Sequence, residues 1–155
     1  MLLAQGENLI DGIGTGAGFY SPLGIAADGR GHLYVADNLN HAIRKIDVAS
    51  ATVSTLAGEP QIQGSSDGVG PTAHFRYPSG VAADSLGNVF VSDSNNAVRR
   101  IDASNGTVTT VVGNLSAAGV RLGPLPAQLT QPSALALTPS GSLLVVSENA
   151  VLLAH

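Results

Sequence analysis

The sequence repeats itself at long range. Pro22–Gly58 reads PLGIAADGRGHLYVADNLNHAIRKIDVASATVSTLAG, and Pro78–Gly113 reads PSGVAADSLGNVFVSDSNNAVRRIDASNGTVTTVVG. A shortened third copy, PSALALTPSGSLLVVSENAVLLAH, occupies Pro132–His155. A period of roughly 55 residues is typical of repeat architectures, in which each unit buries its apolar surface by stacking on its neighbours. We therefore predict a single domain over residues 1–155 that is built from repeated units.

Each complete copy contains four apolar runs of strand length. In the first copy the runs are Leu23–Asp28, His32–Asp37, Ala42–Asp47 and Thr52–Gly58, and in the second copy they are Ser79–Asp84, Asn88–Asp93, Ala97–Asp102 and Thr107–Gly113. The runs are rich in β-branched residues, and the segments between them contain the glycine and asparagine that tight hairpins need. One copy is therefore predicted to form a four-stranded antiparallel meander.

The second run of each copy is apolar on both faces, as in Leu33–Ala36 and Val89–Val91. Because successive side chains of a strand point to opposite faces, such a strand must be covered from both sides. A sheet that is buried between like sheets is the condition of a propeller blade. The predicted fold is all-β: a β-propeller of four-stranded antiparallel blades, with about three blades in this chain.

The segment that leads into each copy is repeated as well. Residues 11–22 read DGIGTGAGFYSP, residues 67–78 read DGVGPTAHFRYP, and the third copy keeps only AQLTQP before its strands. With GxAAD, YVAD, NxxHAIRKI and VxTLAG, the pattern DGxGxxAxFxxP resembles the NHL-repeat β-propeller family. The resemblance covers nearly the whole chain, and it implies a ring closed by about six blades, of which this chain would form half.

The two ends of the chain resemble parts of one blade. The third copy stops after its third strand, and Met1–Gly6 resembles an orphan fourth strand. An open arc would leave apolar blade faces and a hydrophobic edge uncovered. One hypothesis is a head-to-tail homodimer in which the N-terminal strand of one chain completes the last blade of the other, through Met1, Leu2, Leu3, Val151, Leu152 and Leu153. The alternative is that the chain is part of a longer propeller or of a larger assembly.

Composition and charge narrow the function classes. The sequence holds no run of about eighteen apolar residues, so no membrane span is expected. With no cysteine, it has no disulfide, thiolate metal site or cysteine nucleophile, and this leaves the compartment open. The net charge of −4 disfavours nucleic acid. An RNA-binding surface would need Arg44, Arg99 and Arg100, and we expect Asp47 and Asp102 to neutralise them.

The polar turns between the second and third strands are the predicted binding face. In a propeller these turns share one face of the disc with the long connections that bear Phe19 and Phe75, whose rings we expect to wedge between blades. The candidate partner-binding residues are Asp37, Asn38, Asn40, His41, Asp93, Asn95, Asn96, Glu148 and Asn149.

The same residues are also candidates for a metal or catalytic site. Oxygen ligands around a channel can hold calcium, and the resemblance extends to propeller lactonases and lyases that use metals near the axis. Asp37 and Asp93 precede turns, which favours turn capping, because the third copy has Ser147 there. His41 belongs to the repeat pattern, which favours a packing and hydrogen-bonding role. We expect no catalytic residue and no cofactor.

The sequence thus predicts a non-enzymatic scaffold for protein–protein interaction or assembly. A metal-dependent lyase or lactonase-like enzyme is the first alternative, and an RNA-binding module is the second.

Overall fold

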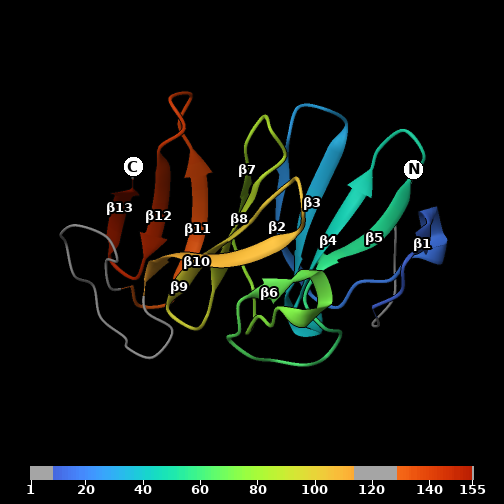
Figure 1. Cartoon of the computed structure of the whole chain (residues 1–155), viewed down its shortest axis with the longest axis horizontal. Helices are drawn as coiled ribbons and strands as arrows, with labels where there is room; N and C mark the ends of the chain where they lie inside the picture. The colour runs from blue at the N-terminus through green and yellow to red at the C-terminus, as the bar shows by residue number, and fades with distance from the viewer. Residues whose placement is uncertain (1–8, 114–128, 155) are drawn as a thin grey trace.

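A computed structural model of the chain describes residues 9–113 and 129–154, and it contains three antiparallel sheets that stand side by side like the blades of a fan (Figure 1). The first sheet consists of β1 (Gly12–Ile13), β2 (Pro22–Ala27), β3 (His32–Asp37), β4 (Ala42–Asp47) and β5 (Thr52–Ala57). The second consists of β6 (Gly68–Val69), β7 (Val81–Ala83), β8 (Val89–Asp93), β9 (Ala97–Ile101) and β10 (Thr107–Gly113). The third consists of β11 (Pro132–Leu137), β12 (Leu143–Ser147) and β13 (Ala150–Ala154).

The predicted meanders are confirmed, and each of the first two blades gains a fifth strand. The order β1-β5-β4-β3-β2 recurs as β6-β10-β9-β8-β7. The two-residue strands β1 and β6 come from the DGxG connections and pair with the outer strand of the blade that they lead into.

The strand-exchange hypothesis stays a prediction, because Met1, Leu2 and Leu3 lie outside the described residues. The arc of sheets is open, as expected for part of a propeller.

Apolar residues fill the spaces between neighbouring blades. One cluster joins Tyr34, Ile43 and Ala57 of the first blade to Phe75 and Val91 of the second. A second cluster packs the second blade against the third around Val98, Leu129, Leu143 and Val145. Phe75 is fully buried in the first of these clusters, which confirms its predicted role as a wedge. Phe19 has no preceding blade in the described chain and packs on the open side of its own blade.

The innermost strands of neighbouring blades approach each other closely because the earlier strand has a glycine at the point of contact. A Cβ atom on Gly24 would stand 2.3 Å from the carbonyl oxygen of Ser79, and one on Gly80 would stand 2.3 Å from that of Ser133. Carbon atoms do not approach a backbone oxygen this closely, so any side chain would force the blades apart. Glycine at these two positions therefore sets the spacing between blades.

No helix within residues 9–113 and 129–154 is long and apolar enough to cross a membrane.

The contact at Gly24 gives a stability prediction. Gly24→Ala should lower the free energy of unfolding by about 1–3 kcal/mol, as overpacking usually does, because the new methyl group meets a rigid backbone carbonyl. Urea denaturation followed by circular dichroism measures the change. Gly16→Ala is the matched control, since nothing lies within 4 Å of its added Cβ. Equal effects of the two substitutions would contradict the close approach.

Candidate functional site

A buried arginine lies at the centre of the first blade. The guanidinium of Arg44 on β4 is fully buried. Its Nη1 donates to the Asp37 carboxylate at 3.0 Å and to the carbonyl oxygen of Gly18 at 2.8 Å. Its Nη2 donates to the Asp11 carboxylate at 2.8 Å and to the carbonyl oxygen of Ile10 at 2.9 Å. One side chain thus joins the incoming connection to the second and third strands of the meander.

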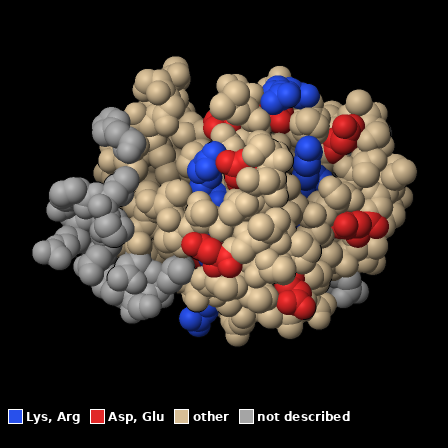
Figure 2. Space-filling model, viewed as in Figure 1, with Lys and Arg blue, Asp and Glu red and all other residues tan. Residues whose placement is uncertain are grey.

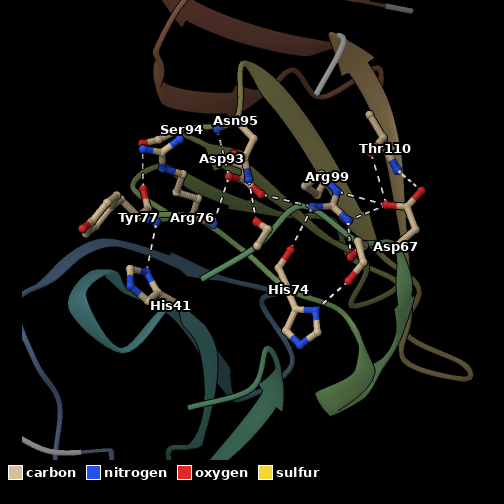
Figure 3. A network of polar contacts seen from close by, with 12 residues as sticks. His41, Asp67, His74, Arg76, Tyr77, Asp93, Ser94, Asn95, Arg99 and Thr110 are labelled. Atoms are coloured by element: carbon tan, nitrogen blue, oxygen red, sulfur yellow. Dashed lines mark hydrogen bonds and ion pairs between the residues drawn. The ribbon is translucent and has the colours of Figure 1, made fainter. Parts of the chain in front are cut away.

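The second blade builds the same network around Arg99 (Figure 3). The Arg99 guanidinium is fully buried and pairs with Asp93 at 3.1 Å and with Asp67. It also donates to the carbonyl oxygens of His74 and Ser66. Burial raises the pKa of the Asp93 carboxyl, while hydrogen bonds and the nearby guanidinium act in the opposite direction. The carboxylates of both blades therefore serve as internal partners of the arginine.

The connection motif and the strand motif form one structural unit. Asp11 accepts hydrogen bonds from the backbone and hydroxyl of Thr55, and Asp67 does the same for Thr110. The guanidinium of Arg44 lies 5.0 Å from the centroid of the Phe19 ring. The corresponding pair in the second blade is separated by 5.4 Å. The repeated Asp, Phe, Asp and Arg of the sequence thus meet at a single place.

The third blade replaces all three inner members of this unit together. Ser147 stands where the first copies have aspartate, and its hydroxyl bonds to the backbone N–H and carbonyl of Thr130. Leu152 stands in place of the arginine and Leu129 in place of the phenylalanine, and both are buried in one apolar cluster. An ionic centre is therefore exchanged for an apolar one, which leaves no buried charge without a partner.

The predicted partner of Arg44 was wrong. Asp47 accepts hydrogen bonds from Ser50 and caps the hairpin turn instead. Arg44 lies opposite Val35 in the ladder, so Asp37 is its diagonal neighbour on the same face of the sheet. The predicted pair of Arg100 and Asp102 is confirmed at 2.9 Å.

Arg44 and Arg99 are buried, so they do not form the basic surface expected for an RNA-binding module. On the face drawn in Figure 2, positive and negative side chains are interspersed.

His41 serves the contact between the first and second blades. Its Nδ1 accepts the backbone N–H of Tyr77 at 3.2 Å, and the two rings meet edge to face with centroids 4.7 Å apart. Asn96, in the second copy, takes the same left-handed backbone conformation, and its Oδ1 accepts the backbone N–H of Gln131 at 3.3 Å. The packing and hydrogen-bonding role predicted for His41 is confirmed, and asparagine performs the same task one blade further on.

Most of the remaining candidate residues also make internal contacts. Asn38 donates to the carbonyl oxygen of Pro78, and Asn40 donates to Asp37. Asn95 donates its backbone N–H to Asp93, which confirms the predicted turn capping for that aspartate. Asp37, Asn40, His41 and Asp93 are buried, and they are therefore unavailable to a partner in this structure. Glu148 and Asn149 are exposed, and Asn38, Asn95 and Asn96 are half-buried.

A further group of exposed side chains near these turns was not among the predicted residues. They come from the two positions before each proline, and we call the group Tyr20, Ser21, Arg76, Tyr77 and Gln131 the rim surface. Tyr20 is 40% exposed and Tyr77 is 38% exposed. Between the second and third blades this surface is hollowed by an open cavity of about 710 Å³. The available signal was that these positions differ between copies inside an otherwise repeated segment.

A smaller pocket of about 190 Å³ lies between the first two blades at their other end. Its wall includes Asp28, which accepts the N–H groups of Arg30 and His32, the His32 ring at 2.8 Å and the Tyr34 hydroxyl. Although burial acts to raise the pKa of Asp28, these hydrogen bonds lower it to about 2. Burial and the neighbouring carboxylate raise the pKa of Tyr34 to about 12. In the second copy Asp84 and Asn88 close the equivalent hairpin. The polar group around Asp28 therefore stabilises a hairpin turn.

No group of three or more histidine, aspartate or glutamate side chains that could hold a metal ion occurs within residues 9–113 and 129–154.

The stacked meanders and their buried ionic centres define the chain as a protein of the β-propeller class. A family model described as NHL repeat matches residues 19–46 and 75–97. The chain is 35% identical over 125 residues to Protein SUPPRESSOR OF QUENCHING 1, chloroplastic, of Arabidopsis thaliana, covering 75% of this chain and 12% of that protein. It is 34% identical over 97 residues to human NHL repeat-containing protein 2, covering 61% and 13% of the two chains. The chain belongs to the NHL-repeat β-propeller family.

Solved structures extend the likeness in fold. A Bacteroides thetaiotaomicron protein of unknown function matches with a TM-score of 0.67 and 24% identity, over 75% of this chain and 30% of its own. A gluconolactonase from Xanthomonas campestris gives a TM-score of 0.56 at 16% identity, over 81% and 34% of the two chains. Regucalcin from Agrobacterium tumefaciens, described as a calcium-binding protein, gives 0.55 at 16% identity, over 95% and 46%. These likenesses show the fold alone. The chain spans between 12% and 15% of the length of these curated relatives.

The buried network gives a prediction with an internal control. Arg99→Met should lower the free energy of unfolding by about 3–5 kcal/mol, because it leaves the Asp93 carboxylate buried without its partner. Arg100→Met, at the next position of the same strand, removes a partly exposed ion pair and should cost about 1 kcal/mol or less. Chemical denaturation of both variants measures the difference. Similar losses for the two would show that burial does not distinguish these arginines.

The contact of His41 predicts a pH dependence. Burial, and then the charge of Arg76, lower the pKa of the His41 imidazole from its ordinary value of 6.5. The unfolded chain therefore binds a proton that the folded chain excludes, so stability is complete above about pH 6.5 and declines as the pH falls toward the lowered pKa. His41→Asn should keep the hydrogen bond to Tyr77 and lose part of this decline. The comparison uses the unfolding free energies of both proteins, measured at pH intervals of about half a unit between pH 5 and pH 7.5. Parallel curves would argue against His41 as the source.

Proposed function

We propose that the chain is a non-enzymatic interaction scaffold that binds a protein partner through the rim surface. The observation that carries the proposal is the contrast between backbone and side chains at this surface. Ser21, Tyr77 and Gln131, each just before a proline, share a left-handed backbone with φ of 53°, 46° and 44°. Their side chains differ in size and chemistry. A fixed backbone that displays different side chains is suited to recognition.

The chemistry of the rim supports a protein partner. Tyrosine and arginine are enriched among the residues that dominate binding energy at protein interfaces. Arg76 and Tyr77 present both residue types beside the open hollow, and Tyr20 is an exposed tyrosine at the position of the first copy that is equivalent to Arg76. The backbone beneath them is held by hydrogen bonds from Leu39 to the carbonyl oxygen of Tyr20 and from Ser94 to that of Arg76. Little conformational entropy of the backbone is therefore lost on binding.

The negative net charge supports a protein partner over nucleic acid. For the lyase or lactonase-like alternative, the similarity to solved structures shows the fold alone. No specific observation in the described residues favours such an enzyme. The rim thus remains the surface on which a test should begin.

Site-specific photo-crosslinking tests the proposal. A photoreactive amino acid at Tyr77 should capture a discrete partner in extracts of the source cells, and the same group at Leu86 should not. Leu86 is 69% exposed and lies on the β7–β8 hairpin, at the other end of the second blade. Arg76→Glu should then weaken binding of the purified partner by at least about tenfold, as expected for a hot-spot residue. A partner captured equally from both positions, or one indifferent to Arg76→Glu, would overturn the assignment.

A further inference from the structure

The pocket between the β2–β3 and β7–β8 hairpins contains a cation without a partner (Figure 1). Lys45 on β4 lies directly opposite Tyr34 in the ladder, so both side chains project from the face of the first blade that packs on the second. Lys45 is half-buried and lines the pocket. Among the described residues its ammonium group makes no hydrogen bond or ion pair. Its three N–H donors are therefore available to a bound molecule.

The second blade shows how the same strand position is satisfied internally. Arg100 on β9 is the counterpart of Lys45 in the repeat. Its guanidinium donates to the side chain of Asn88 at 3.0 Å and to the carboxylate of Asp102 at 2.9 Å. A basic residue at this position can thus be held entirely within its own blade.

In the first blade the two equivalent partners are engaged elsewhere. His32 replaces Asn88, and its ring bonds to the carboxylate of Asp28 at 2.8 Å. Asp47 is the counterpart of Asp102, and its carboxylate accepts the backbone N–H and the hydroxyl of Ser50. The free ammonium group of Lys45 is therefore a specific departure of this blade from the pattern of its neighbour.

The other charged groups of the pocket leave the same balance. Arg30 donates its Nη1 to the carbonyl oxygen of Leu86 at 3.3 Å and forms no ion pair with a carboxylate in the described part of the chain. Asp28 accepts hydrogen bonds from its own hairpin, and Asp102 accepts them from its own turn and from β9. The acceptors of the pocket are thus already used, whereas cationic donors remain.

The rest of the wall is apolar, and the space is small. Its apolar side chains are Leu56, Leu86, Ile101 and Ala103. The volume is about 190 Å³. A cavity of about 150 Å³ is large enough to hold benzene. A ligand of this pocket is therefore a compact molecule that combines an apolar body with an acceptor group of negative charge.

We propose that this pocket binds a small organic acid, with one carboxylate on a ring or a branched aliphatic body. The carboxylate pairs with Lys45, assisted by Arg30, and the apolar body lies against the leucine and isoleucine side chains. Such charge-assisted hydrogen bonds are among the stronger polar contacts in proteins. A single negative charge suits the site better than a phosphate dianion, because the carboxylates of Asp28 and Asp102 also line it. The site lies at the opposite end of the blades from the rim surface and does not depend on the function proposed for that surface.

Benzoate is the probe that tests the proposal. Calorimetric titration of the full chain should give a Kd of about 1 mM or tighter, as a ligand of this size allows. Benzamide, which has the same shape without the charge, should bind at least about tenfold more weakly. Amide NMR shifts that change at Gly87 and Ile101 on addition of benzoate would place the ligand in this pocket.

Two substitutions of one residue separate the charge from the fold. Lys45→Met keeps most of the apolar stem and should weaken benzoate binding at least about tenfold, whereas Lys45→Arg should retain it. Because the ammonium group has no internal partner, both variants should give the circular dichroism spectrum and melting temperature of the wild type. Ala103→Leu leaves every charge in place and should also weaken binding, because the larger side chain occupies the apolar part of the space.

Three results would overturn the proposal. The first is equal binding of benzoate and benzamide, or no binding of either. The second is a folded Lys45→Met variant that binds benzoate as the wild type does. The third is tighter binding of inorganic phosphate than of benzoate, since the apolar wall would then play no part in recognition.

Discussion

The buried guanidinium of each complete blade is the interaction on which its architecture depends. Arg44 and Arg99 are fully buried, and each is held between two carboxylates and two carbonyl oxygens. A charge without partners at this depth would be strongly destabilising. The network therefore holds the incoming connection, the second strand and the third strand in one arrangement. The third blade reaches a similar arrangement with leucine and serine, and it does so only because the inner members of the unit change together.

The contacts between blades follow a second rule, which is independent of the ionic centres. Glycine on the inner strand allows a close backbone approach, and a turn side chain accepts the N–H before the following proline. The junction between the second and third blades obeys this rule although the third blade has no buried arginine. Folding within a blade and docking between blades thus rest largely on different residues, although Phe75 serves both.

The rim surface depends on both rules. Its backbone is positioned by the inter-blade hydrogen bonds, and the connection that carries it is fastened to the blade by Asp11 or Asp67. Of the side chains displayed there, Tyr77 packs on His41, and the displayed residues differ between copies. The structural demands of the repeat fall on buried residues such as Asp37, His41 and Asp93, whereas Tyr20, Arg76 and Tyr77 are exposed.

The sequence by itself determined the repeat, the strands, the antiparallel hairpins and the family, because these depend on the local alternation of apolar residues, on turn chemistry and on motif spacing. It also indicated the structural roles of His41, Asp93 and Phe75. Only the tertiary structure decided that Arg44 pairs with Asp37 and Asp11, since a residue three positions along a strand, such as Asp47, points to the opposite face. The short strands β1 and β6 have too few residues for a periodic signal. Burial of the candidate binding residues likewise depends on how whole blades stack, which no local pattern encodes.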